Sequence, residues 1–63
     1  MYVPAARERV QVAGRPGMFL VVAVDRELGE VDLIPLHNLI SVEEGVSFSE
    51  IEPYHEDVPL KTA

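Results

Sequence analysis

Carboxylates are the most abundant reactive side chains of this 63-residue chain, which contains eleven Asp and Glu. Two of them, Glu43 and Glu44, are adjacent, and paired acids perform general acid–base chemistry where a pocket drives their pKa values apart. A chain this short has little room for both a core and a substrate cleft of roughly a few hundred cubic ångströms. We therefore expect the acids to form a solvated surface, with no catalytic residue.

The other candidates for chemistry are two histidines and four hydroxyls. His37 lies in a connector, and His55 precedes Glu56 and Asp57, a grouping too unspecific to predict a metal site. The segment "GRPG", residues 14–17, is predicted to be a turn, because its proline lacks an N–H that a phosphate-binding nest requires. No histidine is predicted to lie beside a hydroxyl, the hydroxyls being those of Ser41, Ser47, Ser49 and Thr62. The sequence therefore predicts a protein that is not an enzyme and needs no cofactor or metal.

The charge balance is acidic, with five Lys and Arg and a formal net charge of −6. Duplex nucleic acid is bound by neutralising its phosphates, so this balance disfavours nucleic acid and favours a basic protein partner. The absence of cysteine excludes disulfides and thiolate metal sites, and is typical of a cytoplasmic protein. No apolar run approaches the roughly 20 residues of a membrane helix, and the first residues do not resemble a secretory signal. We expect a small cytoplasmic domain without membrane contact.

Short segments in which apolar and polar residues alternate must position these side chains, and they predict β-strands. The segment "RERVQV" places Val10 and Val12 on one face. The segment "MFLVVAVD" is rich in β-branched residues, which favour strands. The segment "EVDLIPL" alternates again after a turn at "RELG", where Gly29 can adopt a positive φ.

A further hairpin is expected over residues 40–48, with its turn at Glu44 and Gly45. The segment 49–54 fits either a strand or a helical turn, and we favour a 3₁₀ turn at 49–52. These elements predict an all-β fold, a small SH3-like barrel of about five short antiparallel strands. The expected organisation is one domain between two flexible termini, with the boundaries 7–54, 1–6 and 55–63.

The central hairpin predicts one apolar face and one divided face. If residues 26–29 form the loop, Asp25 lies opposite Glu30 and Val24 opposite Val31. The core face is then wholly apolar, with Met18, Leu20, Val22, Val24, Val31, Leu33 and Pro35. The opposite face is acidic near the turn, with Asp25, Glu30 and Asp32, and apolar beyond it, with Phe19, Val21, Ile34 and Leu36.

Two interpretations of the apolar half of this divided face differ in what covers it. In the first, barrel closure or residues 46–54 cover it, and it belongs to the core. In the second, it stays exposed between the carboxylates and marks a partner surface or a homodimer contact. The second interpretation predicts partner binding by Phe19, Val21, Ile34 and Leu36, with Asp25, Glu30 and Asp32 attracting basic side chains.

The stretch "RERVQVAGRPGMFLVVAVDRELGEVDLIPL" resembles the first three strands of KOW and Tudor-type small barrels, over residues 8–36. The resemblance rests on a V-x-V strand, a glycine-rich turn, a long apolar strand ending near Asp, and a V-x-L strand. KOW domains bind RNA or ribosomal partners through basic loops, and the resemblance gives that role to Arg7, Arg9 and Arg15. Tudor domains hold methylated side chains in an aromatic cage, for which this chain offers only Tyr2, Phe19, Phe48 and Tyr54.

These residues favour a non-enzymatic protein–protein interaction module that takes a basic partner or a second copy of the chain. The alternative is a nucleic-acid-associated KOW-like barrel that uses the three arginines.

Overall fold

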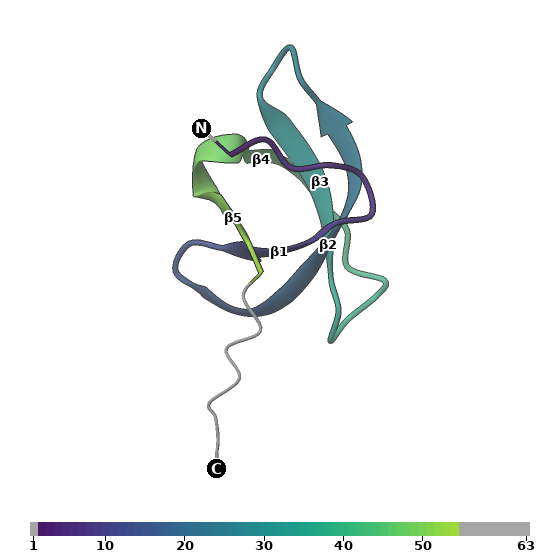
Figure 1. Cartoon of the computed structure of the whole chain (residues 1–63). Coiled ribbons are helices and arrows are strands. Elements are labelled where there is room, and N and C mark those ends of the chain that lie inside the picture. The colour runs from purple at the N-terminus through teal and green to yellow at the C-terminus, as the bar shows by residue number, and fades with distance from the viewer. Residues whose placement is uncertain (1, 55–63) are drawn as a thin grey trace.

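The computed structural model describes residues 2–54, which form a five-stranded antiparallel sheet and one 3₁₀ turn (Figure 1). The elements are β1 (Arg9–Val12), β2 (Arg15–Asp25), β3 (Glu30–Pro35), β4 (Glu43–Ser47), η1 (Phe48–Glu50) and β5 (Ile51–Pro53). The predicted all-β fold with a 3₁₀ turn near its C-terminal end is confirmed. The predicted flexible segment 55–63, which includes His55, lies outside the described residues. None of residues 2–54 belongs to a helix long and apolar enough to cross a bilayer.

The strands follow the order β4-β3-β2-β1-β5, so β4 and β5 are the two edges of a strongly curved sheet (Figure 1). The turn η1 connects these edges. The N–H of Phe48 donates to the carbonyl of Gly29 at 2.8 Å, and the carbonyl of Glu50 accepts from the N–H of Ala13 at 2.8 Å. The predicted closure into a barrel is not observed: β4 and β5 stay unpaired with each other as the two edges, and η1 joins them along the chain.

The core lies on one side of the curved sheet and contains only apolar side chains. Val10 and Val12 are buried, which confirms the predicted alternation of β1. The complete buried cluster is Val10, Val12, Phe19, Val21, Val31, Leu33, Phe48 and Ile51. Tyr2, Val24 and Val46 pack against it, and no polar or charged side chain is buried among the described residues.

The turn between β2 and β3 has the predicted register, with Asp25 opposite Glu30. Like charges at directly opposite positions destabilise a strand pair. Here one Asp25 carboxylate oxygen accepts from the N–H groups of Glu27 and Leu28, each at 3.1 Å, so the side chain caps the turn. Gly29 has the predicted positive φ, +69°, and its N–H donates to the Asp25 carbonyl at 2.9 Å.

The register changes at Val22, three residues before the end of β2, where a bulge corrects the predicted pairing. Ala23 lies opposite Asp32 but Val21 lies opposite Leu33, so Val22 is the extra residue. A bulge shifts the alternation of the strand by one position. The predicted core positions of Met18, Leu20 and Val22 are therefore wrong, whereas those of Val31, Leu33 and Pro35 are confirmed by their burial.

The predicted hairpin over residues 40–48 is also wrong. Residues 36–42 form a loop, and the single strand β4 follows it. Gly45, expected in a turn, is instead part of a second bulge, because Val31 pairs with Val46 and Leu33 with Glu43. Its φ of +71° is readily adopted by glycine, and its N–H donates to the Asp32 carboxylate at 3.2 Å.

The segment before β1 lies against the core. Pro4 is buried, and the Glu8 carboxylate accepts from the N–H of Ala5 at 2.9 Å. The Tyr2 ring packs on the core cluster. Burial, together with the neighbouring Glu8 carboxylate, raises the pKa of Tyr2 to about 12.

Candidate functional site

The solvent-facing side of the β2–β3 hairpin is the strongest candidate for a functional surface. Because Val22 is bulged, the positions of β2 that face this side change there between odd and even numbers. Ala23 and Asp25 face it between the bulge and the turn, and Leu20, which pairs with Ile34, faces it on the other side of the bulge. We call this side the outer face and define it as Leu20, Val22, Ala23, Asp25, Glu30, Asp32, Ile34 and Leu36. Val22 and Leu36 are 41% and 38% exposed, and Leu20 and Ile34 are half-buried.

The structure divides the predicted partner-binding residues between the two sides of the sheet. Phe19 and Val21 are 1% and 0% exposed and belong to the core, as the first interpretation expected. Ile34 and Leu36 lie on the outer face with the predicted acids. A partner cannot reach Phe19 or Val21 in this structure, and partner binding by the accessible residues stays a prediction.

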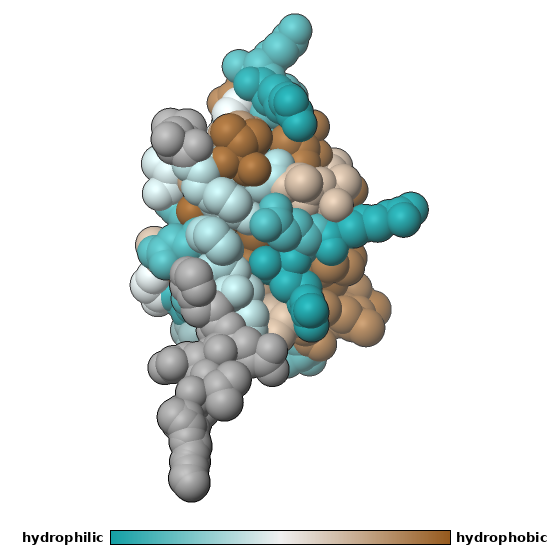
Figure 2. All heavy atoms as spheres, viewed as in Figure 1, coloured by the Kyte–Doolittle hydropathy of each residue, from teal (hydrophilic) through white to brown (hydrophobic). Residues whose placement is uncertain are grey.

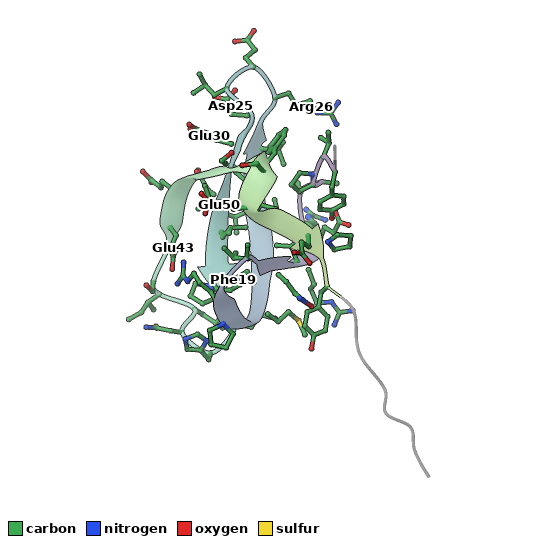
Figure 3. All side chains as sticks on the ribbon, turned by 90° about the vertical axis from the view of Figure 1, so that its left-hand side faces the viewer. Phe19, Asp25, Arg26, Glu30, Glu43 and Glu50 are labelled. Atoms are coloured by element: carbon green, nitrogen blue, oxygen red, sulfur yellow. The ribbon has the colours of Figure 1, made fainter. Side chains whose placement is uncertain are left out.

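The acidic end of the outer face is hollowed. The hollow has a volume of ≈480 Å³ and is lined by Ala23, Val24, Asp25, Glu30, Asp32, Glu44 and Gly45. Four of these seven side chains are carboxylates and none is basic. Figure 3 shows Asp25 and Glu30 close to the tip of the hairpin, whereas Glu43, at the start of β4, lies farther from the tip. The predicted cluster of Asp25, Glu30 and Asp32 is thus brought together.

Glu44 also lines this hollow, although it was predicted to lie in a hairpin turn. The bulge at Gly45 brings it beside Asp32, because two residues of β4 occupy the space opposite one residue of β3. A Glu-Gly pair inside an alternating segment was the signal for this arrangement, since glycine in a strand often marks a bulge.

Within the described residues, the carboxylates around the hollow are not grouped as metal ligands are. No group of three or more His, Cys, Asp or Glu within residues 2–54 is arranged to hold a metal. Asp25 and Asp32 also accept backbone N–H groups of the turn and the bulge. These bonds hold both carboxylates in the lining of the hollow, and four carboxylates so close together produce a negative potential.

Arg15 holds the start of β2 against the start of β4. Its guanidinium forms a forked ion pair with Glu43, in which Nη2 and Oε2 are 2.6 Å apart, and it stacks over the Phe19 ring at 4.9 Å. The hydrogen bonds of this pair lower the pKa of Glu43 and raise that of Arg15.

The three arginines of the nucleic-acid alternative are not gathered at one place. Arg7 and Arg9 are exposed near the start of β1, whereas Arg15 begins β2 opposite the other end of β1 and shares its charge with Glu43. Neutralising phosphates requires accessible cations, so the ion pair weakens this alternative. Nucleic-acid binding itself stays a prediction.

The aromatic residues do not surround a common space. Phe19 and Phe48 are buried in the core, and Tyr2 packs against it. Tyr54 lines a second, smaller hollow of ≈270 Å³ with Glu8, Arg9 and Met18. His37 is exposed in the loop after β3. Within residues 2–54 the four aromatic side chains are therefore not gathered into a cage.

Comparisons of the chain with protein-family models, with curated proteins and with solved structures gave no match.

Proposed function

We propose that this chain is a non-enzymatic protein-interaction module that binds a basic, partly apolar segment of a partner on its outer face. The observation that carries the proposal is the composition of this face. A strand side directed to solvent is normally polar, yet here Leu20, Val22 and Ile34 occupy it next to an acidic hollow.

The fold supports this proposal because the sheet separates the apolar core from the apolar residues of the outer face. The core already contains eight buried side chains from β1, β2, β3, η1 and β5, so the outer apolar residues are not needed to fill it. Apolar surface rimmed by charge is typical of protein-binding sites. The carboxylates add direction, since they attract Lys and Arg of a partner and repel acidic proteins.

The proposal also includes the type of fold to which the five-stranded sheet belongs. The first part of the eleven-residue strand β2, as far as Leu20, pairs with β1. Its later part, from Phe19 to Asp25, pairs with β3. A long bent strand shared in this way is typical of SH3-like domains. We propose an opened SH3-like arrangement of the KOW or Tudor type, in which η1 replaces edge-to-edge pairing.

The test uses a synthetic peptide with leucines at one end and Lys and Arg at the other, titrated into the isotope-labelled chain. Its control is the same peptide with Glu in place of each basic residue. We expect amide chemical-shift changes along β2 and β3 with the basic peptide alone, and weaker binding at higher salt because the attraction is screened. Equal binding of both peptides, or no binding, would contradict the proposal.

Two pairs of variants locate the contact. Val22→Asp should weaken basic-peptide binding about tenfold or more, whereas Val3→Asp, at a valine of similar exposure (46% against 41%) outside the outer face, should not. Glu44→Lys should weaken it similarly, whereas Glu27→Lys, in the turn, should have a smaller effect. A result in which each control matches its test variant would place binding elsewhere.

A further inference from the structure

The loop between β3 and β4 carries a second apolar surface that the proposed function does not use. Leu39, Ile40 and Val42 are 63%, 92% and 52% exposed, and we call these three residues the loop patch. Figure 2 shows apolar side chains gathered at the lower right, where Figure 1 draws this loop. Exposing three large aliphatic side chains within four residues is unfavourable in water unless another surface covers them.

Three backbone hydrogen bonds shape the loop, one that ties its start to β2 and two within its turns. The N–H of Leu36 donates to the Met18 carbonyl at 3.0 Å, and the N–H of Asn38 donates to the Pro35 carbonyl at 3.0 Å. The N–H of Ser41 then donates to the Asn38 carbonyl at 3.1 Å. Because these bonds restrict the backbone, a contact made by this loop loses less conformational entropy than one made by a loop without them.

The surroundings of the loop patch differ in charge from the rest of the molecule. Residues 36–42 contain no Asp, Glu, Lys or Arg, although the chain as a whole has a net charge of −6. The nearest acidic residue along the chain, Glu43, is paired with Arg15. The loop patch therefore has no charge with which to select a basic partner.

From this distribution we propose that the loop patch is a symmetric contact between two copies of this chain. In a two-fold contact each patch meets an identical patch, so an acidic surface would oppose itself. The loop patch is neutral and apolar, and it permits such a contact without placing like charges together. The patch is small, so the contact falls below roughly 1,200 Å² and the association is weak.

Sedimentation of the full chain over a range of concentrations tests this proposal. We expect the average mass to rise from that of a monomer at ~20 μM toward that of a dimer at ~1 mM, as a weak contact requires. Ile40→Asp should weaken the association at least tenfold. Its matched control is Leu28→Asp, at a 68% exposed leucine in the β2–β3 turn, which should associate as the unaltered chain does. Both substitutions lie at exposed positions, and circular dichroism checks that both variants stay folded.

The salt response separates this contact from the peptide binding proposed above. Two copies of charge −6 repel each other, so raising the salt from ~20 to ~500 mM should strengthen self-association, whereas it should weaken binding of a basic peptide. A chain that stays monomeric at ~1 mM in high salt, or an Ile40→Asp variant that associates unchanged, would overturn the proposal. Binding to neutral lipid vesicles that is lost in Ile40→Asp, without self-association, would also overturn it.

Discussion

Val21 and Val22 are adjacent and chemically identical, yet one is completely buried and the other is 41% exposed. In a regular strand two neighbours always face opposite sides, but the sequence alone does not say which side belongs to the core. The bulge at Val22 decides this, because it aligns Val21 with Leu33 and moves Val22 out of the ladder. The β-branched composition of the segment predicts that both valines belong to a strand. The register then decides that Val21 is buried and Val22 is exposed.

The same difference extends along the hairpin as two apolar layers. The inner layer, with Phe19, Val21 and Leu33, is sealed by β1, η1 and β5. The outer layer, with Leu20, Val22 and Ile34, lies outside this buried cluster and is half-buried or exposed. We infer that the inner layer stabilises the fold and that the outer layer is available to a partner.

The largest expected effect comes from placing the same charge on each side of the bulge. Val21→Asp buries a carboxylate without a partner and should lower the free energy of unfolding by about 4 kcal/mol or more, enough to unfold a small domain. Val22→Asp should change it by less than about 1 kcal/mol. Thermal unfolding followed by circular dichroism measures both. Equal losses of stability in the two variants would show that the bulge does not separate them.

A smaller effect is expected at the second bulge. Gly45 has a φ of +71°, and an added Cβ would lie 3.4 Å from Oε1 of Glu30. Gly45→Ala should therefore cost about 1–2 kcal/mol of unfolding free energy. Gly14→Ala is the control, because Gly14 has a φ of +76° with no atom within 4 Å of the added Cβ, so it measures backbone strain alone. A Gly45→Ala variant as stable as the unaltered chain would contradict the β4 register.

The smallest effect concerns Tyr2, on the inner side of the molecule, and appears only at high pH. Its pKa is raised from 10.0 to about 12 in the folded chain, so the unfolded chain loses this proton first. The stabilisation is complete below pH 10 and disappears as the pH rises toward 12. Unfolding by denaturant should show the unaltered chain losing stability relative to Tyr2→Phe over this range. Parallel pH profiles of the two proteins would mean that the Tyr2 pKa is not raised.

Local patterns allowed much of the sheet to be predicted. The alternation of Val10 and Val12, the turn that begins at Asp25, and the positive φ of Gly29 depend on neighbouring residues, and all three are confirmed. The 3₁₀ turn was predicted within one residue of its observed start, Phe48. These features require only short-range hydrogen bonds and side-chain direction.

The errors arose where pairing with a distant strand decides the conformation. In "MFLVVAVD" every side chain from Met18 to Val24 is uncharged and mostly apolar, so no polar residue indicates where the alternation shifts. The bulge at Gly45 depends on its bond to Asp32, thirteen positions away. The acidic members of the outer face were predicted correctly because they lie between the turn and the bulge at Val22, where the predicted register holds. Phe19 and Val21 lie on the other side of this bulge, so they were assigned to the wrong face.

The register of β2 against β3 separates the two apolar layers, and cross-strand nuclear Overhauser effects measure this register. We expect backbone contacts between Val21 and Leu33 and between Leu20 and Ile34, with Val22 unpaired. Contacts between Val22 and Leu33 and between Leu20 and Pro35 would indicate an unbroken ladder. They would place Phe19 and Val21 on the outer face and contradict the account.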